Sequence, residues 1–278
     1  MSVPVALALA VLAFCMLLAL CNNLLYWYET INTPEPAIPA PKPGFVPCLV
    51  RYADSLATHL ICVLLFPLIP LARRRVKQEG TTAGLPPLIL IHGLYNNASV
   101  WLLLGRRLRR AGFPLSTCSY RSFFTSPQRI ALLIEAHVRV VEAAFPGQKP
   151  IFVCHSLGGM LVRHWLLAPE NPPRVKSVLT LGTPHQGSKI AALGPGVLAK
   201  NLLPDAPFIR ELQQAPALAG LFCTALVSPT DEAVLPASNL LPPHGWKMRL
   251  TRRVGHFNML LCPDTAALVL QELRDMSR

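Results

Sequence analysis

Apolar residues dominate the start of the chain, which predicts a long first helix. Residues 3–20 are almost unbroken apolar, and the run continues to an aromatic end at Tyr26, Trp27 and Tyr28. Such a length, with aromatic residues at one end, is typical of a helix that spans a bilayer, and we expect it over about 3–28. A cleaved signal peptide fits less well, because no Lys or Arg precedes the run and no clear small-residue cleavage site follows it.

A second apolar stretch covers residues 56–72, after an extended connector at 33–47 that holds six prolines. It is short for a span, contains two prolines, and is followed at once by the basic cluster 73–77. Such a cluster favours the cytoplasmic side of a membrane. One interpretation is a hairpin of two spans, with the connector outside and the rest of the chain inside. The other is one span plus an interfacial or buried second helix, which leaves the side open.

From residue 81 onward, strand and helix patterns alternate. Buried strands are expected at 85–93, 115–120, 151–154, 175–181, 221–227 and 247–250. Helices are expected after Asn97 or Ser99, from Ser126 onward, and at the end of the chain. This alternation favours an α/β domain over 81–278, built on a mostly parallel, doubly wound sheet, with residues 1–80 as a membrane anchor.

Residues 151–159 read IFVCHSLGG, an apolar run that ends in a serine and two glycines before a new apolar helix pattern. This order is typical of a strand that turns sharply into a helix, with the hydroxyl of Ser156 exposed on the turn. Small neighbours are needed because the two backbones nearly touch there. Gly158 satisfies that need, whereas Cys154 stands where the usual G-x-S-x-G pattern has its first glycine.

A serine nucleophile needs a base that is oriented by an acid. In sheets with such a turn, the acid and then the histidine follow the serine along the chain. Only His256 follows the last predicted strand, and Asp231 lies shortly after the strand that ends at Val227. The alternatives are Glu232 as the acid, or Asp205 paired with His244.

Two backbone N–H groups are the expected donors to a developing oxyanion. One belongs to Leu157, directly after the nucleophile. The other belongs to Leu94, in the loop after the first strand, where we expect His92 to hold the loop in place and not to transfer protons.

Residues 187–220 hold many apolar side chains but no strand pattern. Long insertions of this kind often form lids or binding loops. We expect short helices that cap the site, with Leu202 and Phe208 lining an acyl pocket. The alternative is ordinary core packing.

Composition narrows the choice of partners. The chain is 52% hydrophobic and carries a formal net charge of +12. A basic protein suits anionic lipid or nucleic acid, but the arginines are scattered and no nucleic-acid motif accompanies them, so nucleic acid is not expected. Its eight cysteines lack metal-site or disulfide spacing, so neither a metal nor another cofactor is expected.

Five short sequence segments resemble motifs of a known protein family: ILIHGL, CHSLGGM, LGTPHQGS, SPTDEAVLP and GHFNML. Residues 85–275 resemble a bacterial α/β-hydrolase of the triacylglycerol lipase/esterase type. The piece LLPDAPFIRELQ resembles part of the lid region of those lipases and of GPI-inositol deacylase-like proteins. The resemblance implies an α/β-hydrolase fold with a helical cap and ester hydrolysis. Cys154 and the two N-terminal apolar segments depart from it.

Together these features predict an integral protein of the inner or plasma membrane, with its catalytic domain facing the cytoplasm. We expect a serine hydrolase that cleaves carboxylic esters of lipids or other lipophilic esters, through Ser156, Asp231, His256 and an acyl-enzyme. An acyltransferase with the same three residues is one alternative, and a non-catalytic membrane scaffold is another. The sequence identifies no protein partner.

Overall fold

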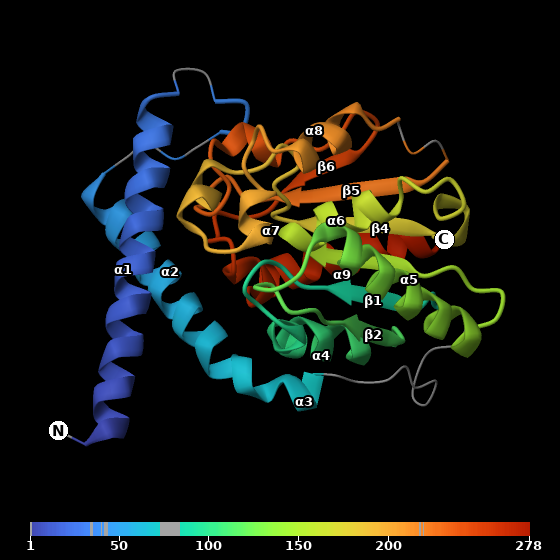
Figure 1. The fold of residues 1–278 in the computed structure, drawn as a ribbon, viewed down its shortest axis with the longest axis horizontal. Helices are drawn as coiled ribbons and strands as arrows, with labels where there is room; N and C mark the ends of the chain where they lie inside the picture. Colours follow the sequence, from blue (N-terminus) through green and yellow to red (C-terminus); the bar gives the residue numbers. More distant parts are fainter. Residues whose placement is uncertain are drawn as a thin grey trace.

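Six parallel strands form one sheet, at the positions that the sequence pattern predicts (Figure 1). The strand order is β2-β1-β3-β4-β5-β6. The strands are β1 (Leu88–Ile91), β2 (Leu115–Cys118), β3 (Ile151–His155), β4 (Ser177–Leu181), β5 (Phe222–Val227) and β6 (Lys247–Leu250). This computed structural model describes residues 2–33, 36–39, 41, 44–72, 84–216, 218 and 220–278. The expected parallel α/β architecture is therefore confirmed.

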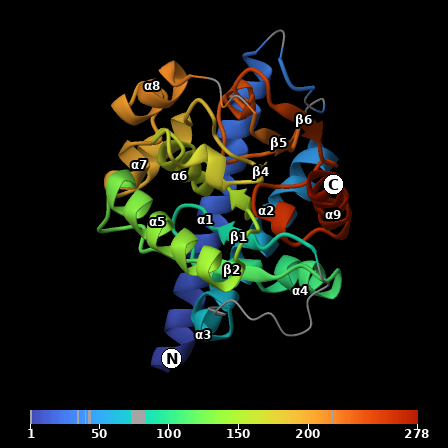
Figure 2. The same cartoon turned by 90° about the vertical axis from the view of Figure 1, so that its right-hand side faces the viewer.

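Helices cover both faces of the sheet (Figure 2). They are α4 (Leu102–Arg110), α5 (Pro127–Ala144), α6 (Leu157–Trp165) and α9 (Pro263–Ser277). Successive side chains of a strand point to opposite faces. Ile89 and Ile91 accordingly join a core with α5 and α6, whereas Leu88 and Leu90 join a second core with α4 and α9. Both faces of the central strands are buried, which explains why those strands read as continuous apolar runs.

The predicted helix starts are observed as side-chain caps. The side chain of Asn97 accepts a hydrogen bond from the Ser99 N–H at 2.8 Å, at the short helix η2 (Ala98–Trp101) that leads into α4. Ser126 accepts one from the Arg129 N–H at the start of α5. Each cap supplies a partner for a backbone donor that the first helical turn leaves free.

The segment 187–220 contains short helices, as expected. These are η4 (Lys189–Leu193), α7 (Val197–Lys200) and α8 (Pro207–Gln214). Most of their buried apolar residues are part of the same core as α5 and α6, whereas Leu193 and Val197 are exposed.

Two long helices precede the sheet domain, α1 (Val3–Ile31) and α2 (Phe45–Leu65), and η1 (Phe66–Leu68) and α3 (Ile69–Ala72) continue α2. The predicted start of the second helix at 56 is wrong, because α2 begins at Phe45. Pro47 lies in its first turn, where the missing N–H of a proline breaks no helical bond. Charged residues at 51 and 54 interrupted the apolar pattern and hid this part of the helix. The basic cluster 73–77 lies outside the described residues.

The helices α1 and α2 stand across the carboxyl ends of the strands (Figure 1). The Tyr26 hydroxyl donates to the Pro229 carbonyl oxygen at 3.0 Å, just after β5. The Asn97 side chain, after β1, donates to the carbonyl oxygen of Phe66 at 3.0 Å. The N-terminal helices are therefore packed against the edge of the sheet at which α/β proteins carry their sites.

The outer surfaces of these helices are apolar. Exposed large side chains on α1 include Val3, Leu7, Phe14 and Leu17, and those on α2 include Leu49, Val50 and Leu64. By length and composition both segments, Val3–Ile31 and Phe45–Ala72, are long and apolar enough to cross a membrane.

Candidate active site

Ser156 lies on a strained turn between β3 and α6. Its φ of 54° and ψ of −127° fall in a region that side chains other than glycine rarely occupy. Two hydrogen bonds fix this turn. The Ser156 N–H donates to the Leu181 carbonyl oxygen at 2.9 Å, and the Thr183 hydroxyl donates to the Ser156 carbonyl oxygen at 2.9 Å. The predicted sharp turn is therefore present and is supported from the neighbouring strand.

The two glycines after the turn have no room for a side chain. A Cβ at Gly158 would lie 2.5 Å from the carbonyl oxygen of Ile91, which belongs to β1. A Cβ at Gly159 would lie 2.3 Å from the Thr183 hydroxyl oxygen. The close approach of backbones inferred from the sequence is therefore present at Gly158, whereas the neighbour of Gly159 is the Thr183 side chain.

Asp231 and His256 form a buried hydrogen-bonded pair. The imidazole Nδ1 lies 2.7 Å from Asp231 Oδ2, and both residues are at most 2% exposed. Oδ1 of the same carboxylate accepts the Ala233 and Val234 N–H groups, which fixes its orientation. Because an ionised carboxylate only accepts, Nδ1 carries the proton and Nε2 is left as the acceptor nitrogen. The alternative pair, Asp205 and His244, is exposed at the surface.

The charge balance around His256 favours its protonated form. Burial alone lowers the pKa of the imidazole. The charge of Asp231, its hydrogen bond and the charge of Glu232 act in the opposite direction and leave the pKa above its ordinary value of 6.5.

Glu232, the alternative acid, contacts the main chain of His256 and not its ring. Its Oε2 accepts the His256 N–H at 3.1 Å. Burial and the adjacent Asp231 raise the pKa of this carboxyl, and the Arg51 guanidinium, 3.7 Å away, opposes that rise, as does the charge of His256. The two adjacent carboxylates thus occupy different places: one orients the ring and the other holds its backbone.

Further hydrogen bonds fix the turn that carries His256. Hydroxyls of Ser228 and Thr230, in the loop after β5, donate to the Val254 carbonyl oxygen at 2.6 and 3.1 Å. The Gly255 N–H donates to Asp54 Oδ2 of α2 at 3.0 Å. The Val254 carbonyl and the Gly255 N–H, which directly precede His256, therefore both have partners. The partner of the Gly255 N–H belongs to α2.

His155 is a residue of the site that the sequence reasoning did not single out. Its Nε2 lies 3.1 Å from the His256 carbonyl oxygen, and the two rings are 4.6 Å apart between centroids. Its Nδ1 is buried and has no partner among the described residues. Burial and the charge of His256 lower the pKa of His155 well below its ordinary value, so the ring is neutral and donates through Nε2. Its position beside Ser156 was the only sequence signal.

The same neighbourhood brings Ser156 and the loop after β1 together. A Cβ at Gly93 would lie 2.8 Å from Ser156 Cβ and 3.2 Å from His155 Nδ1. In the described structure no hydrogen bond joins the Ser156 hydroxyl to His256. Catalytic hydrogen bonds are often long without substrate and tighten when it binds, so this geometry is compatible with proton transfer between Ser156 and His256.

The two expected oxyanion donors flank this contact. Leu157 is the first residue of α6, where backbone N–H groups lack an intrahelical partner, and Leu94 follows Gly93. Neither N–H has a hydrogen-bond partner within the described ranges of the chain. His92 accepts the Tyr120 N–H at 3.1 Å, and its Nδ1 lies 2.8 Å from the Gly93 carbonyl oxygen. Burial lowers its pKa to about 4, so His92 is neutral and acts as a support for this loop.

Leu202 and Phe208 are buried in the core, at 5% and 3% exposure. The Phe208 ring packs against His164 of α6, with 5.4 Å between centroids. Neither side chain lines the cavities found in the described part of the chain. This placement supports the alternative of core packing, and an acyl pocket formed by these two residues stays a prediction.

Comparison with known proteins agrees with this geometry. The family described as alpha/beta hydrolase fold matches residues 86–218. A triacylglycerol lipase of Vibrio cholerae is 26% identical over 161 residues, which are 56% of this chain and 51% of the lipase. A triacylglycerol lipase of Pseudarthrobacter phenanthrenivorans is 32% identical over 120 residues, which are 40% of this chain and 37% of that lipase. The chain therefore spans about half, or less, of the length of these curated relatives.

A solved structure shows the same fold. The mature lipase BlEst2 of Bacillus licheniformis superposes with a TM-score of 0.61 and 18% identity, over 72% of this chain and 94% of the lipase. The family match over residues 86–218 includes β3, Ser156 and α6. The chain thus has the alpha/beta hydrolase fold and is related in sequence to triacylglycerol lipases.

Proposed function

We propose that the protein is a serine hydrolase that cleaves carboxylic esters, with lipids or other lipophilic esters as substrates. The observation that carries the proposal is the buried Asp231–His256 hydrogen bond beside the strained turn at Ser156. A nucleophile, an acid and a base in this order along an α/β sheet fit acyl transfer better than any other reaction class. The relationship to triacylglycerol lipases supports a lipid ester as the substrate class.

The proposed reaction proceeds in two halves. His256 Nε2 takes the proton of the Ser156 hydroxyl while Oγ attacks the ester carbonyl carbon, and the N–H groups of Leu94 and Leu157 stabilise the resulting oxyanion. The imidazolium then gives this proton to the alkoxy oxygen, so the alcohol leaves and an acyl-enzyme remains. Water repeats the sequence on the acyl-enzyme and releases the carboxylic acid. Asp231 keeps Nδ1 protonated and stabilises the imidazolium throughout.

We further propose that the N-terminal helices place this chemistry at a membrane. The apolar outer side chains of α1 and α2 support contact with lipid, because exposed apolar surfaces of this extent are costly in water. The basic character of the chain favours a surface that contains anionic lipid. The cluster 73–77 favours a catalytic domain on the cytoplasmic side.

Hydrolysis of a p-nitrophenyl ester series tests the activity. The detergent-solubilised full chain should release p-nitrophenol from esters of several chain lengths, and Ser156→Ala should abolish release. A fluorophosphonate probe should label the wild type and leave Ser156→Ala unlabelled. Folded wild-type protein that neither labels nor hydrolyses any ester of the series would overturn the proposal and favour a non-catalytic scaffold. Esters formed in place of acid when an alcohol is added would identify an acyltransferase.

Reporter fusions test the topology. A fusion after Lys77 should behave as cytoplasmic, and one at Lys42, in the proline-rich connector, should behave as external if both apolar segments span. A cytoplasmic signal at both positions would leave α1 as the single span with α2 against the domain. An external signal after Lys77 would place the catalytic domain on the opposite side.

A further inference from the structure

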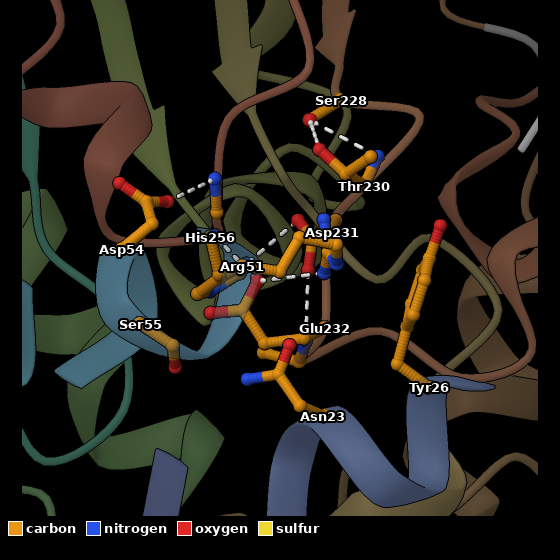
Figure 3. Close-up of polar contacts among 12 residues, drawn as sticks. Asn23, Tyr26, Arg51, Asp54, Ser55, Ser228, Thr230, Asp231, Glu232 and His256 are labelled. Atoms are coloured by element: carbon orange, nitrogen blue, oxygen red, sulfur yellow. Dashed lines mark hydrogen bonds and ion pairs between the residues drawn. The ribbon is translucent and has the colours of Figure 1, made fainter. Parts of the chain in front are cut away.

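The helix α2 is apolar on its outer side but carries charged and polar side chains where it meets the domain. Arg51 and Asp54 point toward the loops that hold Asp231 and His256 (Figure 3). The Ser55 hydroxyl instead lies 3.4 Å from His59 Nδ1 within α2. Arg51 is directed at Glu232, with Nη2 3.7 Å from Oε2, and its side chain is only 11% exposed. The Arg51 guanidinium also lies over the Tyr26 ring of α1, 4.1 Å from the centroid. Both N-terminal helices therefore hold this cation in place.

Arg51 compensates a charge that would otherwise be isolated. Glu232 is 1% exposed, lies next to the carboxylate of Asp231, and has one oxygen, Oε1, without a hydrogen-bond partner among the described residues. The charged or titratable groups that face it are Asp231, Asp54, His256, Tyr26 and Arg51, and the arginine supplies the permanent positive charge. A buried carboxylate that loses its cation becomes protonated or displaces its surroundings.

Asp54 acts on the same turn from the next helical turn of α2. Its Oδ2 accepts the Gly255 N–H at 3.0 Å, and its Oδ1 accepts the Asn258 side-chain amide. A Cβ at Gly255 would lie 2.8 Å from Asp54 Oδ2 and 3.1 Å from Glu232 Oε2. The backbone of this turn is therefore enclosed between two carboxylates, and a side chain at this position would displace at least one of them.

Consecutive N–H groups of the turn thus depend on groups that α2 supplies or stabilises. The Gly255 N–H is bound by Asp54 directly, and the His256 N–H is bound by Glu232, whose charge Arg51 compensates. A buried N–H that loses its acceptor costs free energy, so the turn would shift to find another. Small displacements of a base relative to its nucleophile reduce turnover strongly.

We propose that Arg51 and Asp54 are positioning residues for the base. Arg51 balances Glu232 so that this carboxylate holds the main chain of His256, and Asp54 fixes the turn from Gly255 to Asn258. The helix α2 is then a working part of the active site, and turnover depends on its being seated against the catalytic loops. This inference rests on the role proposed above for His256 as the base.

A double-mutant cycle tests Arg51. In the detergent-solubilised full chain acting on p-nitrophenyl butyrate, Arg51→Met should lower kcat by about tenfold or more and leave KM nearly unchanged. In a Glu232→Gln background the same substitution should cost less than about twofold, because no charge is left to balance. An equal loss in both backgrounds would overturn the proposal, since Arg51 would then only dock the helix.

Three further variants complete that experiment. Arg51→Lys keeps the charge and should recover most of the loss. Glu29→Gln is the matched control, because Glu29 of α1 pairs with the domain through Lys189 at 2.8 Å, away from the triad, and this variant should keep wild-type kcat. If Arg51→Met does not fold, the double variant with Glu232→Gln should still fold and turn over as well as Glu232→Gln alone. Failure of the double variant would reject the charge-balance role.

The pH profile gives a readout that docking alone would not move. The groups that face the His256 ring are Asp231, Glu232, His155 and His59 of α2. Glu232→Gln removes one negative charge, so the acidic limb of kcat/KM should move to lower pH. An unmoved limb would contradict electrostatic contact between Glu232 and the base.

Asp54 is tested by comparison of two substitutions. Asp54→Ala removes both acceptors and should lower kcat, whereas Asp54→Asn keeps one acceptor and should recover part of it. Equal effects of the two would reject a hydrogen-bonding role. If the wild-type protein is active and Asp54→Ala is equally active, the inference about Asp54 is wrong but the proposed function stands. If the wild-type protein is inactive, the proposed function is wrong as well.

Discussion

The turn at Ser156 and the turn at His256 lie at the same edge of the sheet but take their shapes from different contacts. The first combines two hydrogen bonds with close packing, because Gly158 leaves no space between α6 and the backbone of β1 and Gly159 leaves none beside Thr183. The second is fixed by side chains from three separate parts of the chain, which pair with its N–H and carbonyl groups. The turn of the proposed nucleophile therefore depends strongly on steric fit, whereas the turn of the proposed base depends on polar partners from distant parts of the chain.

This difference teaches where each half of the site is vulnerable. A steric support is lost when a neighbour becomes larger, and it is insensitive to pH. A polar support is lost when a charge or an acceptor is removed. Its strength also depends on pH and on the packing of α2 against the loops that carry Asp231 and His256. The following predictions test the contrast, in decreasing order of the expected effect.

The largest effect is expected for removal of the reacting groups themselves. Ser156→Ala and His256→Ala should each lower kcat by about four to six orders of magnitude, and the double variant should be little worse because the two act as a unit. Steady-state kinetics with p-nitrophenyl butyrate measure this. Turnover that persists in either single variant would remove that residue from the mechanism.

The two adjacent carboxylates should differ sharply. Asp231→Asn should lower kcat by roughly 10⁴, because the imidazole loses the partner that sets its tautomer. The loss for Glu232→Gln should be far smaller, because the amide oxygen still accepts the His256 N–H. In the wild type, activity should fall as the pH drops through the His256 pKa, which lies above 6.5. Comparable losses for the two substitutions would mean that the acid has been misassigned.

A steric defect should appear at the serine turn without any change in the pH profile. Gly158→Ala brings a methyl group against the carbonyl oxygen of Ile91 and should destabilise the fold by about 1–3 kcal/mol, with reduced kcat. Gly105→Ala in α4 is the matched control, because its Cβ meets only ordinary contacts of 3.6 Å or more. Thermal unfolding of both variants decides the point; equal melting temperatures would contradict the steric account.

The smallest effect is expected in the helical segment. Phe208→Leu should lower the stability by about 1 kcal/mol, because Phe208 packs in the core. Its effect on kcat/KM should be the same for acetate and long-chain esters. A loss confined to the long-chain esters would revive the predicted acyl pocket and place Phe208 beside the substrate.

The contrast also explains what could be predicted from the sequence. The serine turn is a local feature, so the strand pattern and the spacing of Gly158 from Ser156 were sufficient to predict it. Asp231 and His256 each follow a strand of a parallel sheet, and residues in such positions meet at the same edge of the sheet. Their hydrogen bond was therefore predictable, although Cys154 departs from the usual pattern.

The supports from α2 were not predicted, because their partners are far away in the sequence. Asp54 and Gly255 are separated by 201 residues, and hydropathy alone described this region as a connector and a short span. One signal was present. Arg51, Ser55 and His59 recur at helical spacing between apolar residues, which indicates a helix with one polar face and therefore a polar surface that it meets.

The separation between α2 and its partners has a consequence for the order of synthesis. The ribosome completes Asp54 and Tyr26 long before Gly255 and Pro229, which lie 201 and 203 positions later. Domains begin to fold during translation, but contacts of this range must wait for the C-terminal residues. The emerging chain thus carries a serine turn without a fixed base until its last strand and loop are made. A chain whose synthesis stalls before Gly255 would therefore present the apolar helices and the serine turn without His256 held in place, and the proposed hydrolysis would begin only after the last strand and loop are made.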